Sequence, residues 1–107
     1  MVEIIKLEDA VKIIKGHFNE PSVTINVLWD ARALSNKIRL ISNTLGARFT
    51  LRTRQSTRGI MGVMNDIVVL DRRLKNLTTF ICVPEDLVDD YKSELASKCN
   101  SKVYIIQ

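Results

Sequence analysis

Arginine side chains are concentrated in the middle of this chain. The stretch RFTLRTRQSTRGIMG, residues 48–62, contains Arg48, Arg52 and Arg54 within seven positions. A guanidinium group is planar, always charged and able to donate two parallel hydrogen bonds to one phosphate or carboxylate. This residue type at this density therefore predicts the binding of an anionic partner.

The charge is uneven along the sequence. All eight arginines lie between Arg32 and Arg73, and residues 32–75 hold ten basic residues against two acids. The segments on either side are both net acidic, so the net charge of the whole chain is only +4. A basic segment of this kind attracts nucleic acids by its field and by contact with phosphates.

Spacing along a strand relates these arginines to a nucleic-acid backbone. Side chains two residues apart on a strand point to one face and lie about 6.8 Å apart, which permits contact with successive phosphates. No aromatic residue shares that face to stack on bases, so we predict binding of DNA or RNA with little sequence preference. The predicted nucleic-acid-binding residues are Arg48, Arg52, Arg54, Arg58, Arg72, Arg73 and Lys75.

Other interpretations of the basic middle stay open. It can be a solvated surface, or it can pair with carboxylates of its own chain. The acidic segment 85–99 is complementary to the basic middle of a second copy, which predicts a self-associating homodimer or another protein interaction without nucleic acid. A phosphate-ligand enzyme using the loop 55–62 is less favoured, because that loop matches neither the P-loop nor the GxGxxG pattern. No catalytic residue is assigned.

No cofactor or metal site is predicted. The two cysteines, Cys82 and Cys99, form no CxxC or Cys/His cluster, and His17 is the only histidine. Apolar runs are about five residues long, against the ~20 that span a membrane. The first residues do not resemble a signal peptide, so we expect a cytoplasmic protein with reduced thiols and no membrane partner.

Hydrophobic periodicity predicts the elements that carry these residues. The predicted helices cover residues 3–16 (whose first residues can instead form a short strand), 31–45 after an Asp30 N-cap, and 85–99. The predicted strands cover residues 23–29, 48–53, 64–70, 78–83 and 102–106, with 64–70 and 78–83 joined as a hairpin.

This order of elements predicts one α+β domain over residues 1–107. Our first prediction is a two-layer sandwich of ferredoxin-like type: a mixed four- to five-stranded sheet packed by two helices, plus an N-terminal helix. Such a sandwich leaves one sheet face open for the arginines. The alternative is a three-layer α/β/α sheet, which the wholly apolar strands favour.

Overall fold

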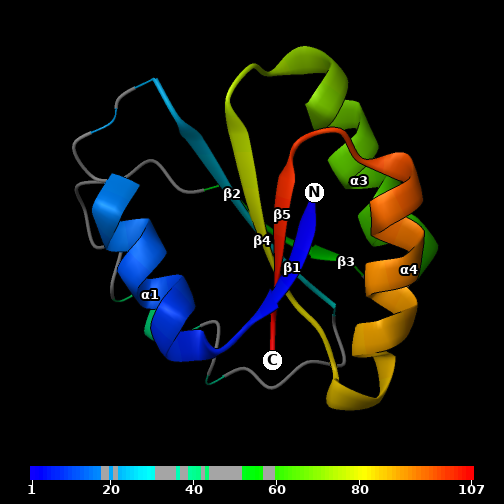
Figure 1. The fold of residues 1–107 in the computed structure, drawn as a ribbon, viewed down its shortest axis with the longest axis horizontal. Coiled ribbons are helices and arrows are strands. Elements are labelled where there is room, and N and C mark those ends of the chain that lie inside the picture. Colours follow the sequence, from blue (N-terminus) through cyan, green and yellow to red (C-terminus); the bar gives the residue numbers. More distant parts are fainter. Residues whose placement is uncertain are drawn as a thin grey trace.

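A computed structural model describes residues 1–17, 20, 22–30, 36, 39–41, 43, 52–56 and 60–107, with the backbone alone at 29–30, 52–56, 60–61 and 63–64. The described strands form one five-stranded sheet in the order β1-β5-β4-β2-β3, and every neighbouring pair is parallel. Figure 1 looks along this sheet from its β1 edge. The strands are β1 (Val2–Ile5), β2 (Thr24–Asp30), β3 (Arg52–Ser56), β4 (Leu77–Cys82) and β5 (Lys102–Ile106).

Helices cover both faces of the sheet. Helix α1 lies on one side of the sheet, while α3 and α4 lie on the other (Figure 1). The described helices are α1 (Leu7–Gly16), α3 (Ile60–Arg73), the short 3₁₀ helix η3 (Glu85–Leu87) and α4 (Val88–Lys98). The described residues at 36, 39–41 and 43 are also helical, as predicted for 31–45, and Ile41 is buried on the α1 side.

Two cores result from the alternation of side chains along the strands. Leu28 and Ile81 pack with Ile67 of α3 on one face, whereas Val27 and Phe80 pack with α1 on the other. Every residue of β4 is buried. A strand that is covered on both faces is apolar at most consecutive positions, because neither set of side chains reaches water; in β4 the exceptions are Thr78 and Thr79.

The predicted mixed sheet is therefore wrong, and the ferredoxin-like sandwich is not confirmed. All described strand pairs are parallel, and helices occupy both faces in the three-layer arrangement that was our alternative. Among the residues that the structure describes, helices pack on both faces of the sheet, so the open face that we expected for the arginines is not found there. Parallel strands require crossover connections, and the helices in those connections pack onto the sheet.

The predicted strand at 64–70 is also wrong, because these residues lie within helix α3. Its β-branched run Ile67-Val68-Val69 is typical of strands, yet Ile67 is fully buried while Val69 is 47% exposed. Tertiary packing outweighed the intrinsic preference of these residues. The predicted hairpin of 64–70 with 78–83 is wrong as well, since 64–70 are helical and β4 pairs in parallel with β2 and β5.

The N-terminal segment divides into a strand and a helix. The structure has β1 at Val2–Ile5 and starts α1 at Leu7, which confirms the short strand that we left open and shortens the predicted helix. The predicted strands 23–29 and 102–106 are confirmed to within one residue. Of the predicted strand 48–53, β3 contains Arg52 and Thr53, while 48–51 lie outside the described residues.

Candidate nucleic-acid interface

Charge separates between the two ends of the sheet. Each described helix runs back from the carboxyl end of the strands, so its C-terminus lies at the end where the strands begin, which we call the amino end (Figure 1). The last turns carry Lys15, Arg72, Arg73 and Lys98. The first turns at the opposite end carry Glu8, Asp9, Glu85, Asp86, Asp89 and Asp90. Both sets complement the helix dipoles.

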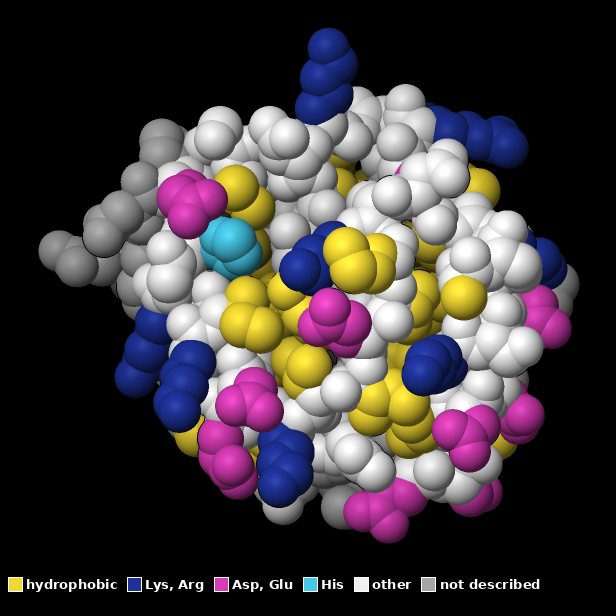
Figure 2. Space-filling view, viewed as in Figure 1, with side chains coloured by type: hydrophobic (Ala, Val, Ile, Leu, Met, Phe, Trp, Pro, Cys, Tyr) yellow, Lys and Arg dark blue, Asp and Glu magenta, His cyan; other side chains and the backbone are white. Residues whose placement is uncertain are grey.

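The surface shows this separation at its top edge and lower right margin, whereas basic and acidic side chains are mixed at its lower left (Figure 2). Figure 2 keeps the orientation of Figure 1, and Lys and Arg side chains project from its top edge, where the strands begin. Acidic side chains gather along its lower right margin. Among the described residues, the amino end therefore gathers cations that would attract an anionic partner.

Three of the predicted binding residues lie together at this end. Arg72 and Arg73 close helix α3, and Lys75 lies in the turn before β4; all three are exposed. Among the residues that the structure describes, none of their side chains forms a hydrogen bond or an ion pair. We define Arg72, Arg73 and Lys75 as the amino-end basic cluster.

Two contacts hold the backbone of this cluster in place. The Asp71 carboxylate accepts hydrogen bonds from the backbone N–H of Asn100, at 3.0 Å, and from the hydroxyl of Ser101. On the other side, the carbonyl of Asn76 accepts a hydrogen bond from the N–H of Thr24, at 3.1 Å. Asn76 adopts φ 55°, a left-handed conformation that asparagine tolerates in tight turns. The backbone that carries the side chains of the cluster is therefore held in place.

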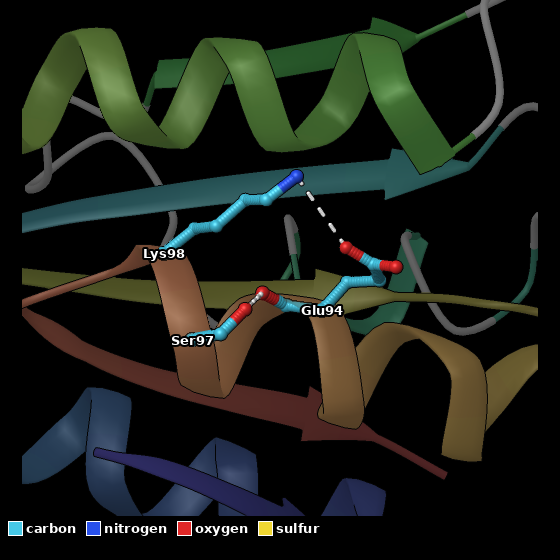
Figure 3. Close-up of polar contacts among 3 residues, drawn as sticks. All are labelled: Glu94, Ser97 and Lys98. Atoms are coloured by element: carbon cyan, nitrogen blue, oxygen red, sulfur yellow. Dashed lines mark hydrogen bonds and ion pairs between the residues drawn. The ribbon is translucent and has the colours of Figure 1, made fainter.

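Two neighbouring lysines at the amino end are already engaged. The Nζ of Lys98 lies 3.4 Å from a carboxylate oxygen of Glu94 one turn earlier, and the hydroxyl of Ser97 donates to the Glu94 carbonyl at 2.9 Å (Figure 3). The Nζ of Lys102 lies 5.0 Å from the centre of the Tyr104 ring. A hydrogen bond with Tyr104 raises the pKa of Lys102 above its ordinary value. Sequence reasoning missed both contacts.

The structure places the backbone of Arg52 and Arg54 on edge strand β3. Arg52 pairs with Asn26 and Arg54 with Leu28 in the neighbouring strand β2. Asn26 is only two residues from Thr24, where β2 begins, so its partner Arg52 also lies near the amino end. Two strand spacings, or about 10 Å, separate β3 from β4. Arg52 is thus brought toward the amino-end basic cluster, although the sequence separates them by twenty residues. Arg48 and Arg58 lie outside the described residues.

The loop considered for a phosphate ligand connects β3 to a helix, not to the strand that we expected. Strand β3 ends at Ser56 and α3 begins at Ile60, while 57–59 lie outside the described residues. In register, Ser56 stands beside Asp30 at the carboxyl end of β2. This end of the sheet is where the acidic first turns gather, so it is less suited to an anionic ligand than the amino end.

Neither cysteine has the properties of a reactive thiol. Cys82 and Cys99 are both buried, and neither forms a disulfide. Burial raises the pKa of Cys99 to about 11, and the negative charge of Asp71 adds to this effect. Within the described part of the chain, no group of three His, Cys, Asp or Glu side chains could hold a metal ion. No helix among those residues is long and apolar enough to cross a bilayer.

Comparisons with known proteins add no family to these observations. The chain matches no family model, no curated protein and no solved structure. Its function must therefore be inferred from its own geometry and charge.

Proposed function

We propose that this protein binds the phosphate backbone of nucleic acid at its amino end, without strong sequence preference. The observation that carries the proposal is the amino-end basic cluster: three exposed cations without partners in the described chain, on an anchored backbone. Each cation that meets a phosphate releases a counterion, so affinity falls as salt rises. Arg52 and Arg54 on β3 would extend the footprint across the neighbouring strands.

Fluorescence anisotropy with labelled single- and double-stranded oligonucleotides, at about 50 mM and about 200 mM salt, tests this function. The double variant Arg72→Ala/Arg73→Ala should bind about 10- to 50-fold more weakly, since two counterion-releasing contacts are lost. The slope of log K against log salt should become shallower by about 1.4 to 1.8, at 0.7 to 0.9 per contact.

Lys12→Ala/Lys92→Ala is the matched control. It removes two exposed cations from other parts of the surface and leaves the amino end unchanged. Equal weakening by both double variants would show that only net charge matters and would contradict a defined interface. A wild-type protein that binds none of the oligonucleotides at the lower salt would reject the function.

An acidic protein surface is the second candidate for the amino end. The acids of η3 and the first turn of α4 are exposed and lie at the opposite end of the same molecule, so they cannot neutralise their own basic cluster. A second copy could therefore dock head to tail. Head-to-tail contacts form closed rings or open filaments, so light scattering should show salt-sensitive assemblies larger than one chain without nucleic acid.

A further inference from the structure

The β1 edge of the sheet offers backbone groups to an additional strand. The N–H groups of Val103 and Gln107 donate to the carbonyls of Met1 and Ile5, both at 2.9 Å, so the odd-numbered residues of β1 face β5. The backbone groups of Val2 and Ile4 must then face away from the sheet. Within the described residues, no hydrogen bond reaches them on that side.

Apolar side chains surround this edge. Val2 and Ile4 are partly buried and pack against the core on the α4 side, together with Leu87. Ile5 and Leu7 do the same on the α1 side. Figure 2 views the molecule from this edge and shows hydrophobic side chains near its centre, with one basic and one acidic side chain among them. Apolar side chains that stay partly exposed beside an unpaired strand edge favour a protein contact there.

The edge has only some of the features by which proteins protect exposed strands. Val2–Ile5 is short and contains the exposed Glu3, but it has no proline or lysine, and its pairing with β5 is regular at all four positions. Natural edge strands are usually blocked by proline, by inward charges or by a bulge. At the other end of the described strand order, β3 contains Arg52 and Arg54, so β1 is the less charged of the two outer strands.

We propose that a second copy of this chain pairs with β1 in an antiparallel arrangement centred on Ile4. The two copies would be related by a twofold axis perpendicular to the sheet, which keeps their helix layers on matching sides. Even-numbered residues of one strand then stand opposite even-numbered residues of the other, and odd-numbered residues opposite odd-numbered ones. Ile4 then stands opposite Ile4 of the partner subunit, and the outward N–H and C=O groups of both residues bond to each other. The N–H of Lys6 reaches the carbonyl of the partner's Val2.

The alternative register, centred on Glu3, is disfavoured for two reasons. It would place two carboxylates opposite each other, and the backbone groups of Glu3 already face β5. Pairing centred on Ile4 joins the two described sheets into a single ten-stranded sheet. It also places the two amino ends at opposite ends of the dimer, so both basic clusters stay accessible.

Sedimentation velocity from micromolar to sub-millimolar protein tests the dimer. The wild type should approach twice the 12.2 kDa of one chain, with little dependence on salt. Ile4→Pro removes only an outward N–H and adds its ring at the interface, so it should stay monomeric over that range. Ile4→Thr, which keeps the N–H, should still dimerise. A wild type that is monomeric throughout, or a folded Ile4→Pro that dimerises, would overturn the proposal.

Cross-linking decides the question if Ile4→Pro does not fold. Opposed residues of a hydrogen-bonded antiparallel pair have Cα atoms about 5.5 Å apart, within disulfide range. Ile4→Cys should therefore form a disulfide-linked dimer under mild oxidation. Glu3→Cys is the control, because the two copies of residue 3 would lie diagonally across the twofold axis, about 7 to 8 Å apart. Native Cys82 and Cys99 are buried. Equal cross-linking of both variants would reject the register.

Discussion

Asp71 illustrates how one carboxylate can organise a basic surface without neutralising it. It lies in the last turn of α3 beside Arg72, yet its two oxygens accept hydrogen bonds from Asn100 and Ser101. It therefore ties the end of α3 to the connection between α4 and β5. The neighbouring arginines keep their charges available to a ligand because this carboxylate is already occupied.

The same carboxylate influences the titration of Cys99. Burial and the charge of Asp71 hold the Cys99 pKa at about 11, compared with an ordinary value of 9.0. The unfolded chain loses this proton from about pH 9, while the folded chain retains it until about pH 11. The stabilising contribution is complete below pH 9 and is lost as pH rises through 11.

Stability against urea, measured between pH 8 and pH 11, checks this prediction. We expect the wild type to lose on the order of 2 kcal/mol more than Cys99→Ala over that interval, because one pKa unit corresponds to about 1.4 kcal/mol. Comparing how the stability of each protein changes with pH cancels the pH-independent loss of stability that truncating a buried side chain causes. Parallel pH profiles for the two proteins would show that the thiol titrates normally in the folded state.

At the scale of elements, α3 was the largest error of sequence interpretation. Its apolar positions Ile60, Val63, Ile67, Leu70 and Leu74 are spaced three and four apart, which is a helical period. The four consecutive apolar residues 67–70 concealed that period, because a short apolar run is typical of a buried strand as well. Counting the spacing over the whole segment would have favoured the helix.

Paired alanine substitutions test the helical assignment. Ile67→Ala should destabilise the protein by about 2 to 5 kcal/mol, since the side chain is fully buried between sheet and helix. Val69→Ala should change stability by less than about 0.5 kcal/mol, because Val69 is 47% exposed and alanine is the better helix former. Chemical denaturation measures both. Similar large losses for the two variants would indicate a strand buried on both faces.

At the scale of the whole molecule, the direction of the helices relative to the strands creates a charge dipole. The exposed acids Asp89 and Asp90 lie at the carboxyl end, away from the amino-end basic cluster. They cannot touch a ligand bound at the amino end, so they can affect it only through the long-range field. Unlike contact energies, that field is screened within about 10 Å at 0.1 M salt.

Neutralising these acids should therefore strengthen nucleic-acid binding modestly. We expect Asp89→Asn/Asp90→Asn to bind about two- to fivefold more tightly at low salt and to match the wild type near 0.2 M salt. Anisotropy titrations at the two salts measure the difference. An improvement that persists at high salt would instead place the acidic end in direct contact with the ligand.

The sequence by itself determined the local features that repeat over a few residues. Composition and hydrophobic period predicted the strands β2 and β5, the acidic helical segment 85–99 and the concentration of arginine in the middle of the chain. The residues Arg72, Arg73 and Lys75 were also identified as binding candidates from sequence, and the structure places them together on one exposed turn.

Only the tertiary structure decided which neighbours those features have. Strand order and direction depend on crossovers between segments far apart in the sequence, and no local pattern encodes whether β4 pairs in parallel with β2. The burial of both sheet faces, the approach of β3 to the end of α3 and the open β1 edge all follow from that order. The physical reason is that packing energy is non-local, whereas periodicity reports only which faces of a segment avoid water.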